Sequence, residues 1–281
     1  MMTDLSALYH PITATPLSPA QRVVEAAPSQ ALRPYVRCFW KEGEACAPTL
    51  VVPDTCMDLL FRWDAASGGY SCCFSALYDR PFFLPVHAQR VPVSFAVRFY
   101  AWSAALFTRA SLAGSRGLAL DAEVYFAPLV HEMLYMLRQT PDFASRCAKA
   151  ESLLYAHLAA PQPESAFGNA IYAILQSRGR LRAHELAKDA HLSLRQLERL
   201  FQRYSGASPK ALSAMVRYQC LWQDALFSPS FCIQDAVYRY GYTDQSHLLR
   251  QFRAYHGLPL GRALALAHGN VAFLQDAFPQ A

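Results

Sequence analysis

The 281-residue sequence lacks several features that would place it in a specialised class of protein. No apolar run reaches the ~18 uninterrupted residues of a membrane span; the closest, Val93–Phe107, is broken by Arg98. The first basic residue is Arg22, so the sequence does not begin as a cationic signal peptide does. The eight cysteines include no C-x₂-C or C-x₄-C pair, and zinc-ligand spacing is therefore missing. We expect a cytoplasmic protein without a membrane segment, a metal or a cofactor.

Catalytic signatures are also missing. His131-Glu132 is followed by Tyr135, where a zinc protease needs a second histidine. Gly114-Ser115 lacks the flanking pattern of a nucleophile elbow, and no glycine-rich phosphate loop occurs. The sequence therefore predicts a protein that is not an enzyme.

The composition and the charge distribution indicate two different domains. With 53% hydrophobic and 17% charged residues, the chain can build real cores, and its length suits about two domains of ~150 residues. Residues 1–160 hold 13 basic and 13 acidic side chains, whereas residues 161–281 hold 13 basic and 8 acidic ones. The net charge of +5 thus belongs to the C-terminal part, as expected of a domain that attracts a polyanion such as nucleic acid.

The first domain is predicted to be α+β. Short apolar or alternating runs separated by Pro, Gly and Asp predict strands at Val36–Lys41, Leu50–Val52, Met57–Trp63, Tyr70–Leu77 and Val91–Trp102. Helical spacing then predicts helices over Ser103–Leu112, Glu123–Arg138 and Asp142–Leu158. The second helix carries an apolar stripe of Val124, Leu129, Met133, Leu134 and Leu137. We expect a loose tail over residues 1–30 and this domain, with a barrel or curved sheet, over residues 31–160.

A Pro-rich segment from Ala160 to Ser165 predicts the boundary, and beyond it every strong signal is helical. The all-α domain over residues 161–281 contains an internal repeat. Arg199, Phe201, Tyr204 and Gly206 recur 51 residues later, as shown by Arg250, Phe252, Tyr255 and Gly257.

Each copy follows a short helix, a turn and a capping residue, which is the spacing of a helix-turn-helix unit. In the first unit, about residues 181–206, Ser193 is the predicted N-cap, and Gln196 completes a capping box. In the second, about residues 232–257, Gly241 ends the first helix and Thr243 is the predicted N-cap. Small residues in the first helices (Ala187, Val237) and apolar ones in the second (Leu197, Phe201, Leu248, Phe252) would set a steep crossing angle.

Ser208-Pro209 predicts the start of a connecting helix that reaches about Phe227. Its 19 residues at ~1.5 Å each make a rod of roughly 28 Å. Such a rod would let two recognition helices enter successive major grooves about 34 Å apart on one DNA face. The alternative is a helical bundle with a duplicated, solvated polar face.

This domain resembles the AraC/XylS family of bacterial transcription regulators over about Leu181 to Arg262. The resemblance is carried by the stretches 241–252 and 192–201, by Gly257, and by Arg217 in the connecting helix. His191 stands where the family has glycine, and Asp224 stands where it tends to be apolar. The resemblance implies control of transcription near promoters, more often activation, with double-stranded DNA and RNA polymerase as partners.

The polar faces of the two second helices supply the candidate DNA contacts. The residue types suit base reading, because Arg bonds guanine, Gln adenine and Glu cytosine. The candidate base readers are Arg195, Gln196, Glu198 and Arg199 in the first unit and Gln245, Ser246, His247 and Arg250 in the second. The candidate contacts to the DNA backbone are Ser193, Thr243, Arg203 and Arg253.

The first domain leaves several interpretations open. The stretches 32–40 and 52–61 resemble an N-terminal module that often precedes this DNA-binding domain and binds an effector, dimerises, or does both. The aromatic residues Phe61, Trp63, Phe74, Phe95, Phe99 and Trp102 would either line a site for a small apolar ligand or form the core. Likewise, Leu129, Met133, Leu137 and Leu153 would form either a homodimer face or core, with core favoured in both cases.

The cysteines allow two further hypotheses. They are Cys38, Cys46, Cys56, Cys72, Cys73, Cys147, Cys220 and Cys232. Cys72 and Cys73 would face opposite sides of a strand and so could not share a metal. Buried thiols are the favoured interpretation; the alternatives are a thiol- or metal-dependent sensor and a DNA-repair protein that uses the helices for targeting.

Overall fold

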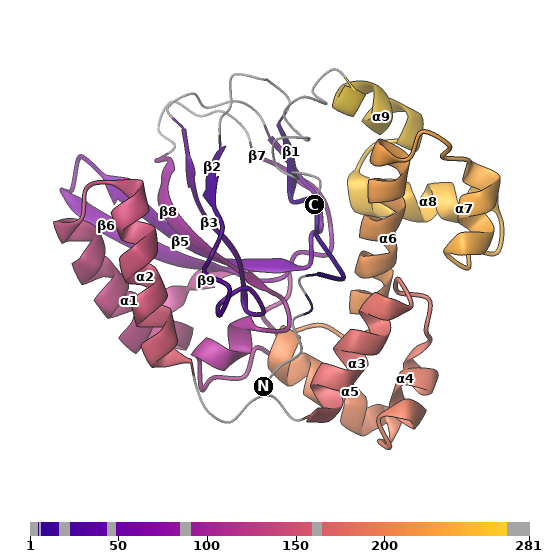
Figure 1. Cartoon of the computed structure of the whole chain (residues 1–281), viewed down its shortest axis with the longest axis horizontal. Coiled ribbons are helices and arrows are strands. Elements are labelled where there is room, and N and C mark those ends of the chain that lie inside the picture. The colour runs from indigo at the N-terminus through magenta and orange to yellow at the C-terminus, as the bar shows by residue number, and fades with distance from the viewer. Residues whose placement is uncertain are drawn as a thin grey trace.

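The computed structural model describes residues 5, 7–16, 23–43, 49–84, 91–158 and 165–268. Its first part is built on β-sheets with two covering helices, and its second part is helical (Figure 1). This is the predicted α+β domain followed by an all-α domain. No helix among the described residues is long and apolar enough to cross a membrane.

A six-stranded antiparallel sheet forms the centre of the first domain. Its strands are, in spatial order, β2 (Val23–Ala26), β3 (Val36–Glu42), β8 (Val93–Tyr100), β5 (Cys56–Asp64), β6 (Gly69–Ser75) and β9 (Ala119–Asp121). A smaller antiparallel sheet contains β1 (Ala14–Pro16), β4 (Thr49–Val51) and β7 (Phe82–Leu84). The five predicted strands are confirmed as β3, β4, β5, β6 and β8. The other four have only three or four residues each, too few for alternation to identify them.

The prediction of a loose tail over residues 1–30 is wrong for the part of this segment that the structure describes. Leu5, Tyr9 and Ile12 are each at most 3% exposed, and β1 and β2 both lie within the first 30 residues. The Tyr9 hydroxyl is 3.1 Å from the Thr55 hydroxyl, which donates to it. Composition alone misled the prediction, because scattered apolar residues can pack well without any regular period.

The candidate aromatic lining is the core of this domain. Phe61, Phe74, Phe95 and Phe99 are fully buried and Trp102 is 1% exposed, whereas Trp63 is 41% exposed. The rings pack on one another and on the neighbouring helix, as in the edge contact of Phe74 with Phe126 at 4.9 Å between centroids. The core interpretation is therefore confirmed for five of the six residues and is wrong for Trp63, whose ring packs against Tyr70 at 4.9 Å between centroids.

Two helices, α1 (Ala122–Gln139) and α2 (Phe143–His157), cover one face of the large sheet (Figure 1). Pro128 lies inside α1, and Phe126 leaves the helical region with φ −127° and ψ 26°. A proline inside a helix removes one backbone hydrogen bond, and its ring crowds the carbonyl group four residues earlier, so α1 is kinked here.

The predicted stripe is wrong at its first residue. Val124 is 70% exposed, and Phe126 faces the core at the helical spacing of Ala122 and Leu129. Leu129, Met133 and Leu137 are buried and Leu153 packs against the same cluster. These four side chains therefore belong to the core, as favoured over a homodimer face.

The predicted helix over Ser103–Leu112 is wrong. Only a short 3₁₀ turn, η1 (Ala104–Phe107), forms there, and Thr108 is extended. The Thr108 hydroxyl donates to the Tyr125 carbonyl oxygen and accepts from the Ala110 amide, which draws the chain out of the helix.

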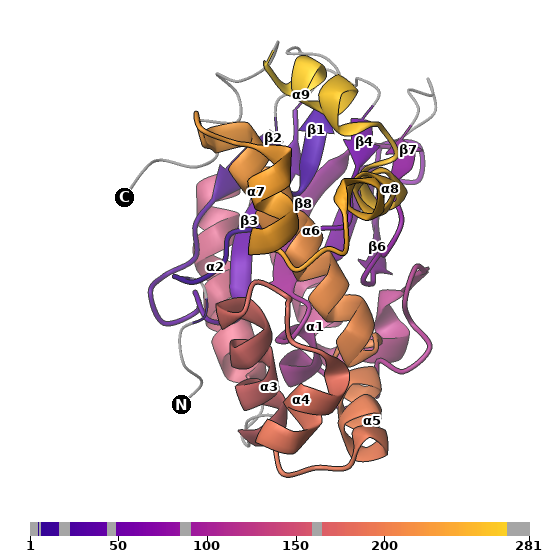
Figure 2. The same cartoon turned by 90° about the vertical axis from the view of Figure 1, so that its right-hand side faces the viewer.

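The C-terminal domain contains α3 (Ser165–Gln176), α4 (Ala183–Asp189), α5 (Leu194–Ser205), α6 (Pro209–Phe227), α7 (Ile233–Arg239), α8 (Gln245–His256) and α9 (Leu260–His268). Helix α6 has the predicted bounds, with Ser208 as N-cap accepting from the Ala211 amide and Pro209 in the first turn. It runs through the middle of the domain, with the other helices around it (Figure 2).

One buried side chain of α6 ties the two domains together. The Gln219 amide nitrogen donates to the carbonyl oxygens of Ile12 (2.9 Å) and Pro53 (2.6 Å), and its amide oxygen accepts from the Ile12 amide (2.9 Å). Gln219 is fully buried, so each of these backbone groups depends on it for its hydrogen bond.

We predict that Gln219→Ala lowers the free energy of unfolding by about 3 kcal/mol, because it leaves buried backbone groups without partners. Urea denaturation of the full chain measures this. Gln223→Ala is the matched control one turn further along α6: its side chain donates to the His10 carbonyl oxygen in an exposed position, and we expect a loss below about 0.5 kcal/mol. Equal losses in the two variants would show that Gln219 has no special role.

Candidate nucleic-acid interface

The first helix-turn-helix unit consists of α4, a turn at His191, and α5. His191 has φ +54°, in the left-handed region, and the Leu192 amide closes the turn on the Ala187 carbonyl oxygen at 2.9 Å. The predicted capping box of α5 is confirmed: the Ser193 hydroxyl accepts from the Gln196 amide, and the Gln196 side-chain oxygen accepts from the Ser193 amide. Histidine therefore takes the place of the glycine that the family pattern has at this turn.

The second unit repeats this geometry in α7 and α8. Gly241 has φ +66°, and the Tyr242 amide closes the turn on the Val237 carbonyl oxygen at 2.9 Å. In both units the first helix contributes a small buried residue at this point, Ala187 or Val237. Leu197 and Phe201 of α5, and Leu248 and Phe252 of α8, are fully buried as predicted.

The predicted N-cap of the second recognition helix is wrong by one residue. Helix α8 begins at Gln245, and the Asp244 carboxylate accepts from the His247 amide at 2.7 Å. The Thr243 amide instead donates to the His247 ring nitrogen at 3.5 Å. The repeat contained the signal, because the 51-residue offset pairs Ser193 with Asp244 rather than with Thr243.

Most of the candidate DNA contacts are exposed on the two recognition helices. The exposed candidates are Arg195, Gln196, Glu198, Arg199, Gln245, Ser246 and Arg250, together with Ser193, Thr243, Arg203 and Arg253. His247 is half-buried, with its ring against the edge of the Tyr242 ring at 5.4 Å. No ion pair within the described part of the chain involves Arg195, Arg199 or Arg250, so their guanidinium groups are available to an external partner.

Helix α6 fixes the separation of these two faces. Helices α5 and α8 lie near its opposite ends and on the same side of it (Figure 2). At the Pro209 end, Gly179 touches α6 so closely that a Cβ atom would lie 2.1 Å from the Ser213 carbonyl oxygen. Arg217 of α6 stacks its guanidinium over the Tyr242 ring at 5.0 Å, which joins α6 to the turn of the second unit.

Asp224, which departs from the family pattern, joins three elements. Its carboxylate accepts from the Tyr240 hydroxyl at 2.6 Å and from Arg239 at 2.8 Å, and Arg178 lies 3.7 Å away. The acidic residue therefore fastens α6 to α7 and to the end of α3.

The first domain contacts the C-terminal ends of both recognition helices. The Leu112 amide donates to the Arg203 carbonyl oxygen at 2.9 Å, and a Cβ atom on Gly206 would lie 2.6 Å from the Ser115 hydroxyl. At α8, Gln251, Ala254 and Tyr255 share a hollow with residues 79–81, and Pro81 lies against Gly257. The N-terminal halves of α5 and α8 stay open.

The environments of the described cysteines do not favour a reactive thiolate. Cys38, Cys56 and Cys147 are buried, and burial raises the pKa of Cys147 to about 11 and that of Cys220 to about 12. Cys72 and Cys73 pack into different apolar clusters on the two faces of β6. Cys46 lies outside the described residues. Within those residues, no group of three or more His, Cys, Asp or Glu side chains is arranged to hold a metal.

Comparison with known proteins identifies the two parts of the chain separately. Residues 186–265 match a family model described as a helix-turn-helix domain, and residues 24–117 match one described as a domain of unknown function, DUF6597. The C-terminal domain therefore contains a helix-turn-helix domain, in agreement with the AraC-type resemblance of this part of the sequence.

Solved structures similar to this chain include several of ToxT from Vibrio cholerae. One, in the P21 crystal form, is 10% identical with a TM-score of 0.39, covering 91% of this chain and 99% of that chain. Another, with unsaturated fatty acid bound, is 9% identical with a TM-score of 0.37, covering 92% and 97%. Comparison with curated proteins gives no match.

We predict that the free energy of unfolding depends on pH through His256, a buried residue at the end of α8. His256 is 1% exposed, its Nδ1 lies 2.8 Å from the Tyr218 hydroxyl, and burial lowers its pKa from 6.5 to about 4. As the pH falls from about 6.5 to about 4, the unfolded chain takes up a proton that the folded chain does not, so this residue lowers the free energy of unfolding by up to about 1.4 kcal/mol per pH unit.

Urea denaturation of the wild type and of His256→Gln, between pH 7 and pH 4.5, isolates this contribution. Asp54, whose pKa burial raises to about 6, acts in the opposite direction but equally in both proteins. We expect a shallower loss of stability with falling pH in the variant than in the wild type. Parallel pH profiles would show that His256 does not titrate as described.

Proposed function

We propose that the protein is a sequence-specific transcription regulator that inserts α5 and α8 into successive major grooves on one face of a DNA duplex. One observation carries the proposal. Both helix-turn-helix units have a hydrogen-bonded turn and a capped recognition helix, and the exposed polar faces of the two recognition helices lie on one side of α6. The excess of positive charge in residues 161–281 supports it, because phosphate attraction supplies much of the affinity for DNA.

Each exposed side chain has a role that its chemistry supports. Arg195, Arg199 and Arg250 would donate paired hydrogen bonds to guanine, and Glu198 would accept from cytosine. Gln245 would pair with adenine, and Ser246 suits several bases. In the second unit His247 has less freedom, because its ring is held by Tyr242 and by the Thr243 amide.

Gln196 would contribute less to base recognition than the sequence suggests. Its side-chain oxygen accepts from the Ser193 amide at 2.9 Å and from the Ser193 hydroxyl at 2.8 Å, so only its amide nitrogen is left for a base. Adenine recognition by glutamine uses both atoms. We therefore assign Gln196 chiefly to capping α5.

Contacts to the DNA backbone would come from Ser193, Thr243, Arg203 and Arg253, which flank the base-reading faces at the two ends of each recognition helix. Such contacts fix register without reading sequence. The family resemblance extends the proposal to activation through RNA polymerase, to control by a small-molecule effector in the first domain, and to a homodimer.

We predict that Arg250→Ala weakens binding to the preferred duplex by about 1–3 kcal/mol and relaxes base choice at one position. The measurement is selection of duplexes from a random pool by each protein, followed by titration of the selected duplex at several salt concentrations. Arg262→Ala, which removes an exposed charge from α9, is the matched control and should change neither property. An equal loss of affinity for every sequence would make Arg250 a phosphate contact and contradict its assignment as a base reader.

A further inference from the structure

The segment that joins α3 to α4, residues 177–182, lies between the two helix-turn-helix units. In Figure 2 it runs between α4 and the turn that joins α7 to α8. Gly179 holds this segment against α6: it has φ +73°, and a Cβ atom there would lie 2.7 Å from the Arg217 amide nitrogen. Three residues of the segment are exposed arginines: Arg178, Arg180 and Arg182. None of the three is among the DNA contacts assigned above.

Arg178 has a structural role. Its guanidinium lies 3.7 Å from the Asp224 carboxylate of α6 and donates to the Tyr240 hydroxyl at 3.5 Å. These contacts fix the position of the segment relative to the second unit. Arg182 is the N-cap residue of α4, so it lies at the start of the first unit rather than between the two.

Arg180 lies against the turn of the second unit. A Cβ atom on Gly241 would lie 3.9 Å from the Cδ atom of Arg180 and 4.0 Å from its Cγ atom. The aliphatic part of the side chain therefore covers the turn that immediately precedes α8. The guanidinium of Arg180 forms no ion pair or side-chain hydrogen bond with any other residue in the described part of the chain.

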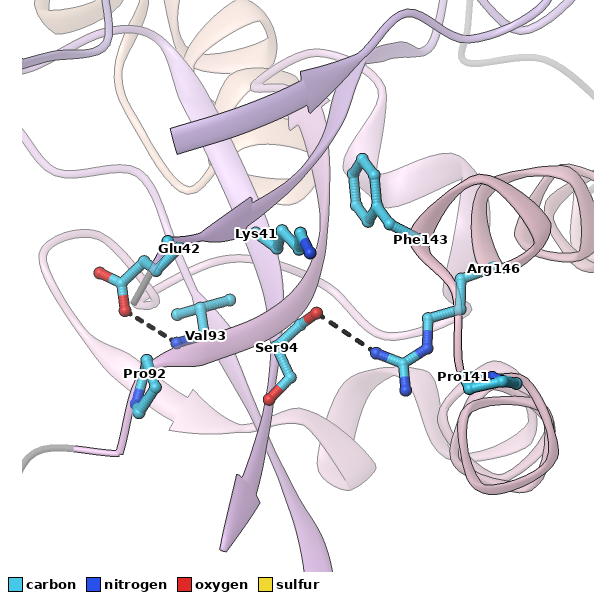
Figure 3. A pocket seen from close by; sticks show the side chains of 9 residues that line it. Lys41, Glu42, Pro92, Val93, Ser94, Pro141, Phe143 and Arg146 are labelled. Atoms are coloured by element: carbon cyan, nitrogen blue, oxygen red, sulfur yellow. Dashed lines mark hydrogen bonds between the residues drawn. The ribbon is translucent and has the colours of Figure 1, made fainter. Parts of the chain in front are cut away.

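Other arginines of this molecule show what a structural arginine looks like here. Arg98 forms two hydrogen bonds to the Asp58 carboxylate, at 2.9 and 3.2 Å. Arg146 donates to the Ser94 carbonyl oxygen, as Figure 3 shows. Arg180 has an ordered stem and no such partner for its charged end, so its five N–H donors are available to an external acceptor.

The first unit has a side chain of its own at the equivalent position. His191 and Gly241 both have left-handed backbone conformations, with φ +54° and φ +66°, and each directly precedes the residue whose amide closes the turn. In the first unit the His191 side chain projects from this point, whereas in the second unit the glycine leaves the space that the Arg180 stem fills. Each unit thus presents N–H groups beside the start of its recognition helix.

The place of Arg180 along the DNA follows from the two units. Successive major grooves on one face of a duplex are about 34 Å apart, and the minor groove between them faces the same side. The turn at Gly241 lies on the side of the second unit that faces the first (Figure 2). Arg180 therefore lies level with the region between the two major grooves.

A minor groove attracts arginine most strongly where A·T pairs make it narrow, because narrowing enhances its negative potential. Guanidinium is also more weakly hydrated than ammonium, which lowers the cost of entering a narrow groove.

We propose that Arg180 contacts the minor groove between the two major-groove sites and makes the protein prefer A·T pairs there. The proposal rests on the proposed function, because it requires α5 and α8 to occupy successive major grooves. It adds a third contact region, in a stretch of DNA that the recognition helices do not reach.

Titration of the full chain with three duplexes tests this contact. The duplexes share both selected major-groove sites and differ only in the base pairs midway between them, which are A·T, G·C or inosine·C. Inosine lacks the minor-groove amino group of guanine, so inosine·C has the major-groove pattern of G·C without that group. We expect the wild type to bind the A·T and inosine·C duplexes at least about fivefold more tightly than the G·C duplex.

Arg180→Gln keeps the Cγ and Cδ atoms that cover Gly241 and removes the charge. This variant should bind all three duplexes with affinities within about twofold of one another. Arg262→Gln removes an exposed charge from α9 and should keep the wild-type ratios.

Three results would overturn the proposal. The inosine·C duplex could bind as weakly as the G·C duplex, which would place the reading outside the minor groove. Arg180→Gln could keep the full A·T preference, which would assign it to the flexibility of the DNA. The variant could lose affinity equally on all three duplexes, which would make Arg180 a phosphate contact. Failure to select two sites one helical turn apart would instead contradict the proposed function itself.

Discussion

Helix α6 is the element on which the arrangement of the whole molecule depends. Leu212, Met215 and Val216 in its first half are buried in the cluster that contains the first helix-turn-helix unit. Tyr218, Leu221 and Trp222 in its second half are buried in the cluster that contains the second unit. Because both units pack on one rigid helix, their separation and relative orientation are set by a single covalent element.

The same helix joins the DNA-binding domain to the first domain. The cluster around the first unit also contains the aromatic core of the large sheet, and the cluster around the second unit includes Ile12, Leu50 and Val52 of the first domain. The chain segments on either side of residues 159–164 are therefore connected through packed side chains as well as through the backbone. The first domain contacts the C-terminal ends of α5 and α8 directly.

The sequence predicted best those features that depend on neighbouring residues. Ser193 with Gln196, Ser208-Pro209 and Gly241 are local signals for caps and turns, and each takes its expected conformation. The N-cap of α8 was wrongly predicted as Thr243 instead of Asp244. Threonine and aspartate both cap helices, and only the alignment of the two repeats identifies Asp244 as the N-cap. The prediction of a helix over Ser103–Leu112 was wrong because the chain leaves the helical conformation at Thr108. The hydroxyl of Thr108 bonds the Tyr125 carbonyl oxygen of α1, a contact between residues distant in sequence.

Features built from distant segments were not predictable from the sequence. Gln219 reads as an ordinary polar residue of a helix, and only the fold brings Ile12 and Pro53 to it. Arg180 likewise meets the turn of the second unit at Gly241 only through the fold. By contrast, the recognition faces were identifiable because each lies on one helix, where spacing alone determines which side chains share a face.

The central claim is that one chain reads two successive grooves through a rigid spacer. Hydroxyl-radical footprinting of the protein on its selected duplex tests this most directly. The account predicts two protected regions on one face of the DNA, about one helical turn apart, and loss of one region when about five base pairs are inserted between them. A single protected region, or two regions on opposite faces of the duplex, would contradict it.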